Sequence, residues 1–492
     1  MASATFTRLR ARSGLRTISA ATWAKLAFAG LCVLALIGFF AYPTYPNYDS
    51  YYSLIWGREL LDGHKPSFEG YRHPTEHPLA VAFGALLSLL GEGADRVLVF
   101  CSLASFVALC AGLYRLARLS FGALVGAVAV VLLCTRFDYA FLAIRGYLDI
   151  TYLALVVWAG AIEISRRRAG LPVFALLLLA AWLRPEAWVL LGVYFLWCLP
   201  GASWPRRALY AALVAAGPAA WLLLDGWATG DPLFSLNSTS GLAEELGRAA
   251  GLSAVPSSTQ EFLLRLDKGP VLAAAVPGIL LAIWMAPRRS VVPLVGLLSG
   301  LGTFTAVAIA GLSVIQRYLL VSALMLMVFA AVTLAGFAML RDDAPTRRWW
   351  AAGSVAVVVA GVVWTAIHID PGKMTQQLDI RTESHASLSA LLADPAIEEG
   401  LSCGAVSVPT HKLVPDVRWL LDRGADGVVA RSDRSPAARR AARRGLAIVV
   451  TGRDALSQWV FTDRSVAPRL NLPPDGFARV ATSRYFAAYV RC

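Results

Sequence analysis

The sequence predicts an α-helical polytopic membrane protein with a small α/β domain at its C-terminal end. Of its 492 residues, 57% are hydrophobic and 16% are charged, whereas soluble domains contain about 45–50% apolar and about 25% charged residues. Apolar runs that approach the length of a membrane-spanning helix, about 20 residues, recur between positions 24 and 368. From about Asp370 onward the composition changes to that of a soluble protein.

The basic residues lie mainly in short clusters between the apolar runs. The formal net charge is +13 at pH 7, but clusters such as 166–168 and 347–348 fall at turns that we predict on the cytoplasmic side. Lys and Arg mark that side of a membrane protein and contact anionic lipids. We therefore expect membrane lipids, and no nucleic acid, as partners. The N-terminus is expected in the cytoplasm and the C-terminus outside, in a plasma or inner cell membrane.

The N-terminal part predicts a cytoplasmic tail, one span and a large outer loop. Residues 1–23 form the basic tail, and the span at 24–42 is expected to stay uncleaved because no small-residue cleavage pattern follows it. Residues 43–95 form the first outer loop. Within this loop the apolar run 79–90 is too short for a crossing and is expected to lie in the membrane interface.

The rest of the multi-span domain, which ends at residue 368, brings the total to about eleven spans. The further spans are expected at 96–117, 121–138, 150–164, 171–199 (a short pair), 208–226, 269–286, 291–311, a stretch that ends before Arg341, and 349–368. Residues 137–152 and 231–268 are expected to form polar outer loops. The pair within 171–199 stays open, because one long helix there would move every later loop to the other side.

Residues 369–492 are predicted to form a small extracytoplasmic α/β domain. Strands are expected at 405–408, 427–430, 446–451, 476–482 and 485–491, and helices at 417–423, 436–444 and 453–459. Cys403 and Cys492 lie near the start and at the end of this part, so a disulfide between them is expected outside the cytoplasm. The other five cysteines lie in or beside apolar runs and are expected to be inert thiols.

The predicted outer loops collect ionisable residues at five places. These are Asp49, Arg145 with Asp149, Arg184 with Glu186, Asp231, and Arg317 with Tyr318. Charged groups at membrane depth are costly and indicate function. Because the predicted topology brings all five places to one face, we expect them to share a site. Arg145 and Asp149 are four residues apart and would lie on one face if the loop continued as a helix.

The arrangement resembles the GT-C superfamily of membrane glycosyltransferases, with mannosyltransferases and arabinosyltransferases as the nearest analogues. The matching motifs, within residues 24–340, are NYDSYYSLIWGRELLDG around Asp49, HPTEHPL, Arg145 with Asp149, Leu183–Glu186 and Arg317–Leu320. Ser50 follows Asp49 where many members have a second acid. His73-Pro74 and His77-Pro78 stand where many members have His-Pro-Pro. We find no family counterpart for residues 369–492.

The resemblance implies inverting transfer of a sugar from a polyprenyl-phosphate donor to an envelope glycan, lipid or protein on the outer face. Asp49 is the expected general base, since the attacking acceptor hydroxyl must lose a proton. Arginine binds phosphate bidentately, so Arg317, Arg145 and Arg184 are expected at the donor phosphate. The expected substrate-binding residues are Tyr48, Tyr52, His73, His77, Asp149, Glu186 and Tyr318. No cofactor and no metal-ligand set is identified, and a divalent cation is left open.

Several of these residues also have a structural alternative. A turn is the favoured alternative at Asp231-Pro232, Arg184 would snorkel to the headgroups, and Arg317 would anchor the chain at the interface.

Asp49 would serve as the N-cap of an interfacial helix. Asp149 would serve as the ion-pair partner of Arg145. His73 and His77 would simply begin a helix or lie in the interface.

Two other functions remain as alternatives at the level of the sequence. A transporter or flippase of a lipid-linked or anionic substrate also needs charges in the membrane. It predicts charges near the midplane and internal repeats, whereas this sequence keeps them at one predicted face and shows no repeat. A non-catalytic scaffold for envelope assembly predicts that Asp49→Ala has no effect.

Overall fold

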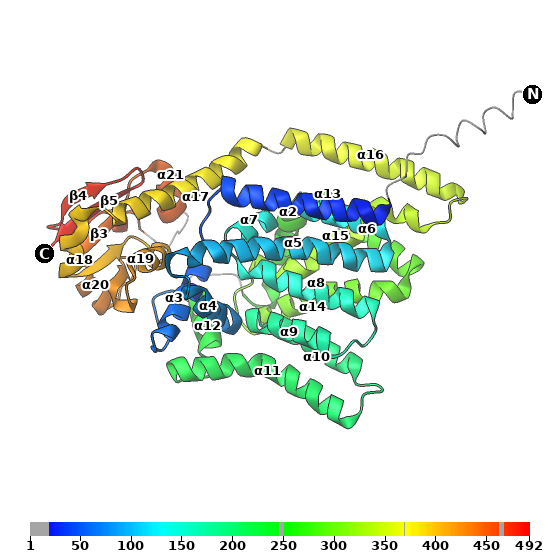
Figure 1. Cartoon of the computed structure of the whole chain (residues 1–492), viewed down its shortest axis with the longest axis horizontal. Helices are drawn as coiled ribbons and strands as arrows, with labels where there is room; N and C mark the ends of the chain where they lie inside the picture. The colour runs from blue at the N-terminus through cyan, green and yellow to red at the C-terminus, as the bar shows by residue number, and fades with distance from the viewer. Residues whose placement is uncertain (1–18, 246–249, 369, 462–466) are drawn as a thin grey trace, which may run out of the picture.

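The computed structural model describes residues 19–245, 250–368, 370–461 and 467–492. Its helices form a bundle, and a C-terminal α/β domain lies at one end of this bundle (Figure 1). Seven described helical segments are long and apolar enough to cross a membrane, or eight if a pair bent by 67° forms one span. The protein is therefore a multi-pass helical membrane protein, and the total of eleven spans stays a prediction.

The long apolar helices coincide with predicted spans. They are α2 (Ala20–Ala41), α5 (Ala94–Phe121), α8 (Leu148–Ser165), α11 (Trp204–Thr229), α13 (Val255–Met285), α14 (Pro287–Ile309) and α15 (Leu320–Ala335), which the 3-10 helix η3 (Gln316–Leu319) precedes. The bent pair consists of α6 (Ala123–Cys134) and α7 (Phe137–Ile144). A further helix, α16 (Pro345–His368), covers the last predicted span.

Three apolar helices are shorter than the candidate membrane spans. The interfacial run is α4 (Pro78–Ser88), and the open pair is resolved into α9 (Leu171–Leu183) and α10 (Ala187–Cys198). The helices α9 and α10 are separate because Pro185 follows Arg184, and a residue before proline is disfavoured in the α region. Arg184 accordingly has extended backbone angles.

Two predicted polar loops are in fact largely helical, which corrects the sequence expectation. Residues 137–152 contain α7 and the start of α8, and residues 231–268 contain α12 (Phe234–Glu245) and the first half of α13. The latter half-helix ends at Lys268, whose positive φ of 66° breaks α13. These helices were missed because α7 is short and α12 is polar, so neither contributes a long apolar run, whereas packing at the end of the bundle still favours them.

The helix α15 is the most buried of the candidate spans. Within its apolar window, 83% of the residues are buried in the protein. It packs against α13, α6 and α14. A Cβ at Gly278 of α13 would overlap the Phe329 carbonyl, so glycine is needed for this close approach. The centre of the bundle therefore lies around α15, and η3 directly precedes it.

The C-terminal domain contains a five-stranded sheet in the order β2-β1-β3-β5-β4. The strands are β1 (Ala405–Val408), β2 (Val428–Ala430), β3 (Gly445–Val450), β4 (Ala478–Thr482) and β5 (Phe486–Arg491). β1 pairs in parallel with β2 and β3, and β5 pairs antiparallel with β3 and β4. The described helices of the domain include α17 (Pro371–Leu392), α18 (Glu398–Cys403), α19 (Val414–Leu421), α20 (Pro436–Ala441) and α21 (Arg453–Leu456). A disulfide joins Cys403 to Cys492.

The helix α3 (Tyr48–Leu61) connects the two parts of the molecule. It lies at the end of the bundle near the α/β domain (Figure 1) and packs against α4 and α19. Residues 50–57 are all buried, because α3 is covered from both sides. The buried Arg418 of α19 binds Glu59 at 2.7 Å, which fixes the α/β domain to this helix.

Candidate active site

Asp49 lies in the first turn of α3, but it does not cap the helix. The Oδ1 atom of Asn47 accepts hydrogen bonds from the backbone N–H groups of Asp49 at 2.8 Å and Ser50 at 3.4 Å. Asn47 is therefore the N-cap, and the capping alternative for Asp49 is excluded. The Asp49 side chain remains available for a contact elsewhere in the fold.

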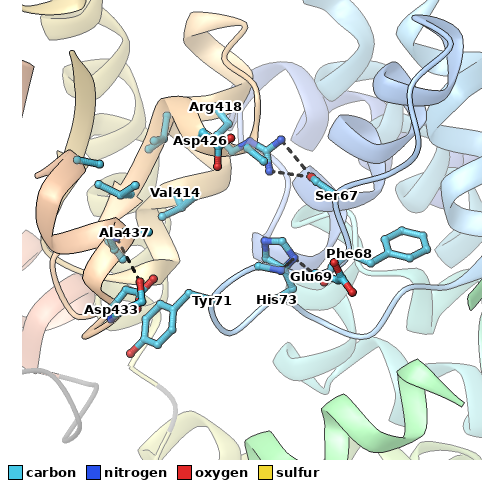
Figure 2. A pocket seen from close by; sticks show the side chains of 18 of the residues that line it. Ser67, Phe68, Glu69, Tyr71, His73, Val414, Arg418, Asp426, Asp433 and Ala437 are labelled. Carbon is cyan, nitrogen blue, oxygen red and sulfur yellow. Dashed lines mark hydrogen bonds between the residues drawn. The ribbon is translucent and has the colours of Figure 1, made fainter. Parts of the chain in front are cut away.

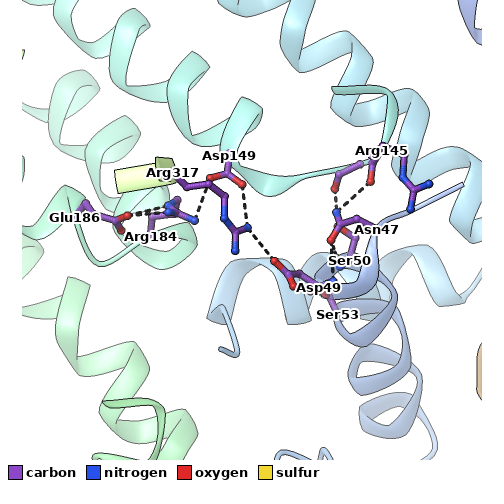
Figure 3. Close-up of polar contacts among 10 residues, drawn as sticks. Asn47, Asp49, Ser50, Ser53, Arg145, Asp149, Arg184, Glu186 and Arg317 are labelled. Carbon is purple, nitrogen blue, oxygen red and sulfur yellow. Dashed lines mark hydrogen bonds and ion pairs between the residues drawn. The ribbon is translucent and has the colours of Figure 1, made fainter. Parts of the chain in front are cut away.

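Five charged side chains from four segments form a continuous chain of ion pairs (Figure 3). Arg317 Nη1, on η3, lies 2.9 Å from Asp49 Oδ2 and 3.5 Å from Asp149 Oδ2, in the first turn of α8. Arg184 Nη1 lies 3.1 Å from Asp149 Oδ1, and Arg184 Nη2 lies 2.9 Å from Glu186 Oε1. Three of the five places predicted from the sequence are thus brought together, with Asp149 added from a fourth.

Solvent exposure of the side chains divides the chain of ion pairs into two parts. The side chains of Arg317 and Asp49 are 32% and 18% exposed, whereas Asp149 is 0%, Arg184 is 4% and Glu186 is 7% exposed. Asp49 and Arg317 therefore form the solvent-accessible end of the chain of ion pairs. The other three groups are buried and hold Arg317 in place, because a buried charge is stable only when it is paired.

Arg145 does not pair with Asp149, which corrects the expectation that the two share a helix face. Gly146 has a φ of 68° and separates the end of α7 from α8. The Arg145 guanidinium lies 4.0 Å from the Tyr45 ring centroid and donates to the Pro46 carbonyl at 3.2 Å. The Arg145 carbonyl in turn accepts from the Asn47 backbone N–H at 2.8 Å. Arg145 therefore supports the start of α3.

Asp231 is also separate from the charged chain. Its carboxylate accepts from the Leu233 backbone N–H at 2.9 Å and from Asn237 Nδ2 at 2.8 Å. Asp231 thus stabilises the turn that precedes α12 and also binds a side chain of that helix. The expectation that all five acidic and basic places share one site is wrong for Asp231, and the alternative of a turn at Asp231-Pro232 is confirmed, since an Asx turn satisfies its carboxylate.

Aromatic side chains lie along the chain of ion pairs, at both its accessible and its buried end. The Tyr48 ring contacts Tyr52 edge-on at 5.1 Å, and Tyr52 lies 4.5 Å from the His73 ring. On the other side, Tyr318 lies 5.6 Å from the Arg184 guanidinium carbon. The Tyr147 ring, which we did not predict from the sequence, has its centroid 5.7 Å from the guanidinium carbon of Arg317.

Of the two predicted histidines, His77 is buried and His73 is partly buried, and both are electrically neutral near pH 7. Burial lowers the pKa of His73 to about 4. Burial also lowers the pKa of His77, and the positive charges of Arg184 and Arg317 add to this effect. His77 occupies the N-cap position of α4 and packs edge-on against Trp221 at 5.3 Å. No group of three or more potential metal ligands occurs within the described residues.

A second acidic site was missed, although its first member lies in the HPTEHPL motif. Glu76 is 2% exposed, and burial together with the nearby Asp225 carboxylate raises its pKa to about 8. Asp225, on α11, accepts from the backbone N–H and the hydroxyl of Ser235, both at 2.9 Å. Glu76 adjoins His77, so the motif itself was the available signal, but only the fold shows that α11 contributes a second carboxylate.

The fold is similar to that of ArnT from Cupriavidus metallidurans bound to undecaprenyl phosphate. The TM-score is 0.58 at 14% sequence identity, with 96% of this chain and 98% of that chain covered. The apo state of the same protein gives a TM-score of 0.59 with the same identity and coverage. This chain has the GT-C fold.

The GT-C likeness extends into the α/β domain, because 96% of the chain is covered. The expectation that residues 369–492 have no counterpart is therefore corrected. A more distant similarity links the chain to the apo oligosaccharyltransferase of Archaeoglobus fulgidus, with a TM-score of 0.49, 10% identity, and 89% and 70% of the two chains covered. No protein-family model matches the sequence, and no curated protein matches it.

Proposed function

We propose that the protein is a glycosyltransferase that uses a polyprenyl-phosphate sugar as its donor. The observation that carries the proposal is the Asp49–Arg317 pair, because an accessible carboxylate and an accessible guanidinium lie 2.9 Å apart. Support also comes from the GT-C fold and from the similar ArnT structure, which holds undecaprenyl phosphate. A proton acceptor and a phosphate-binding cation are the two groups that such a transfer needs.

The proposed reaction is a direct displacement with inversion at the anomeric carbon. The acceptor hydroxyl oxygen attacks this carbon, and the bond from the carbon to the donor phosphate oxygen breaks. The polyprenyl phosphate leaves with the electron pair of that bond. Asp49 takes the hydroxyl proton, and Arg317 stabilises the negative charge that develops on the phosphate.

The buried members of the chain of ion pairs are proposed to position Arg317. Asp149 contacts both Arg317 and Arg184, and Glu186 contacts Arg184. When Arg317 binds the phosphate, Asp149 still compensates part of its charge. Arg145 lies apart from these groups and is assigned to the support of α3. Tyr48, Tyr147 and Tyr318 would line the sugar site, whereas Tyr52 is buried behind Tyr48.

The proposed location follows from the basic clusters in the sequence. With the N-terminus in the cytoplasm, the site and the α/β domain lie on the outer face of the cell membrane. The acceptor is then a component of the cell envelope, namely a glycan, a lipid or a protein.

The proposal is tested by measuring sugar transfer from a panel of radiolabelled polyprenyl-phosphate sugars in lipid nanodiscs. Asp49→Asn keeps the size of the side chain but removes the base, and we expect transfer to fall by about 10²–10⁴-fold while donor binding persists. Asp62→Asn is the matched control, since Asp62 is an exposed acid at the end of the same helix.

Two results would contradict the proposal. Transfer at the wild-type rate by Asp49→Asn would exclude Asp49 as the base and direct attention to Glu76 and Asp225. Absence of transfer from every donor, with a folded wild-type protein, would favour a transporter, a flippase or an assembly scaffold.

A further inference from the structure

A cleft separates the first loop from the α/β domain (Figure 2). Its volume is about 650 Å³. One wall is the segment 66–73, and the other includes β2, α20 and part of α19, while the end of α11 also contributes to the lining. None of the five residues in the chain of ion pairs lines this cleft, but two of the substrate-binding residues expected from the sequence, Tyr52 and His73, do.

Hydrogen bonds fix the two walls to each other at both ends of the cleft. At one end, both Nη atoms of Arg418 lie 3.3 Å from the Ser67 hydroxyl, and Glu59 binds Arg418 and Ser67. At the other end, the Tyr71 hydroxyl donates to the Ser432 carbonyl at 3.0 Å. The cleft is therefore a preformed cavity between two braced walls.

The charges that face the cleft are mostly negative. Arg418 is 1% exposed, and the charge of Glu59 balances it. His73 is neutral near pH 7, since burial lowers its pKa to about 4. Among the described residues that line the cleft, Glu69, Asp426 and Asp433 are then opposed by one further cation, Arg440. An excess of carboxylates repels phosphate groups and accepts hydrogen bonds from hydroxyl groups.

Aromatic rings accompany these carboxylates in the lining. Tyr71 is partly exposed, and Tyr52 and Phe68 lie deeper in the wall. Ring faces with a few convergent polar groups suit a small ligand that has both apolar C–H surfaces and hydroxyl groups. A sugar ring without a phosphate group has this chemistry.

The cleft is connected to the proposed catalytic pair through Tyr48. Tyr48 precedes Asp49 in the chain, and its hydroxyl donates to the Arg72 carbonyl at 2.5 Å. Arg72 lies between two residues that line the cleft and has a positive φ of 54°. The wall of the cleft is thus anchored to the residue beside Asp49.

We propose that this cleft binds an uncharged sugar residue of the acceptor and so presents the acceptor to Asp49. Glu69 and Asp433 accept hydrogen bonds from its hydroxyl groups, and Tyr71 packs on its ring. That the bound sugar belongs to an acceptor rests on the proposed glycosyltransferase function. The binding of an uncharged sugar, however, can be measured without any transfer.

The test is isothermal titration of the full-length protein in nanodiscs with neutral trisaccharides of mannose, galactose, glucose and arabinose. The 6-phosphate form of each hexose trisaccharide serves as the charged counterpart. We expect one or more neutral probes to bind, and their phosphorylated forms to bind more weakly. In Glu69→Gln/Asp433→Asn, the affinity should fall about tenfold or more, because hydrogen bonds to charged groups are lost.

A second variant fills the cleft without removing any contact between its walls. Ala437→Trp places a large side chain at an exposed position of α20 that lines the cleft, and it should abolish binding. Glu398→Gln, an exposed acid of α18 outside the lining, is the control and should bind as the wild type does. The thermal unfolding of each variant shows whether it is folded.

The outcomes separate this inference from the proposed function. Undiminished binding in both cleft variants, tighter binding of the phosphorylated probes, or no binding of any neutral probe would overturn the assignment of the cleft. Sugar binding that the cleft variants abolish, in a protein that transfers no sugar from any donor, would uphold the cleft and overturn the transferase proposal.

Discussion

Arg317 Nη1 donates a hydrogen bond of 2.9 Å to Asp49 Oδ2, although 268 positions separate the two residues in the sequence. Asp49 lies in the first turn of the helix that follows the first span, and Arg317 precedes the most buried helix of the bundle. Their contact joins the first loop to the centre of the fold. Because both side chains are partly exposed, the same pair is also the accessible end of the chain of ion pairs.

Two replacements of Arg317 should distinguish the contribution of its positive charge from that of its planar guanidinium group to phosphate binding. In Arg317→Ala, we expect sugar transfer to fall by about 10²–10³-fold, the usual cost of removing one group that stabilises developing charge. Arg317→Lys should recover part of this loss, since lysine is a point charge without the planar fork of arginine. The measurement is kcat/KM for the donor. Equal activity of the Ala and Lys variants would contradict a role at the phosphate.

Asp149→Asn tests whether the buried carboxylate positions Arg317. The substitution removes a negative charge that compensates the positive charges of Arg184 and Arg317. A broken buried ion pair typically costs about 3–5 kcal/mol of stability. A displaced Arg317 should also lower kcat by about 10²-fold, while the KM for the acceptor changes little. Asp138→Asn, at a half-buried acid of α7, is the control. A loss of stability with an unchanged kcat would limit Asp149 to a structural role.

Glu76→Gln should change the pH dependence of stability in a defined direction. The pKa of Glu76 is raised in the folded protein from 4.5 to about 8. Between these two values the unfolded chain releases the proton and the folded protein keeps it, so this group lowers stability as the pH rises through the window. Glutamine removes the titration. We therefore expect the variant to gain Tm relative to the wild type at pH 8 but not at pH 4.

The matched control for that experiment is Glu69→Gln, which replaces an exposed acid of the same loop. Its Tm should follow that of the wild type from pH 4 to pH 8. A wild-type Tm that rises relative to Glu76→Gln over this window would contradict the buried, protonated state of Glu76.

The two ion pairs between α3 and the α/β domain should differ in their contributions to stability. Arg418 is 1% exposed and Glu59 is 17% exposed, whereas Asp422, the partner of Arg58, is 80% exposed. Glu59→Gln should destabilise the domain contact by about 3–5 kcal/mol, because it leaves a buried cation unpaired. Asp422→Asn should cost less than about 1 kcal/mol. Hydrogen exchange in α19 measures both, and equal effects would contradict this ranking.

Much of the architecture followed from the sequence, because it depends on local composition. Apolar runs between arginine clusters located the long helices, since a bilayer requires both features. The five strands of the C-terminal domain were also predicted close to their observed bounds, because short apolar runs lie between turn residues there. Helices such as α7 and α12 were missed, because their sequences lack a long apolar run and their packing surfaces come from elsewhere in the chain.

The sequence by itself determined which residue types carry the chemistry, and the tertiary structure alone decided how they pair. Asp49, Asp149, Arg184, Glu186 and Arg317 were found from charge at membrane depth, which depends only on local sequence. Arg145 belonged to the same pattern, but the turn at Gly146 directs it to Tyr45 instead of Asp149. The pairing of Glu76 with Asp225 and the cleft above segment 66–73 require distant segments to meet. Such contacts depend on packing, for which a single sequence carries no periodic signal.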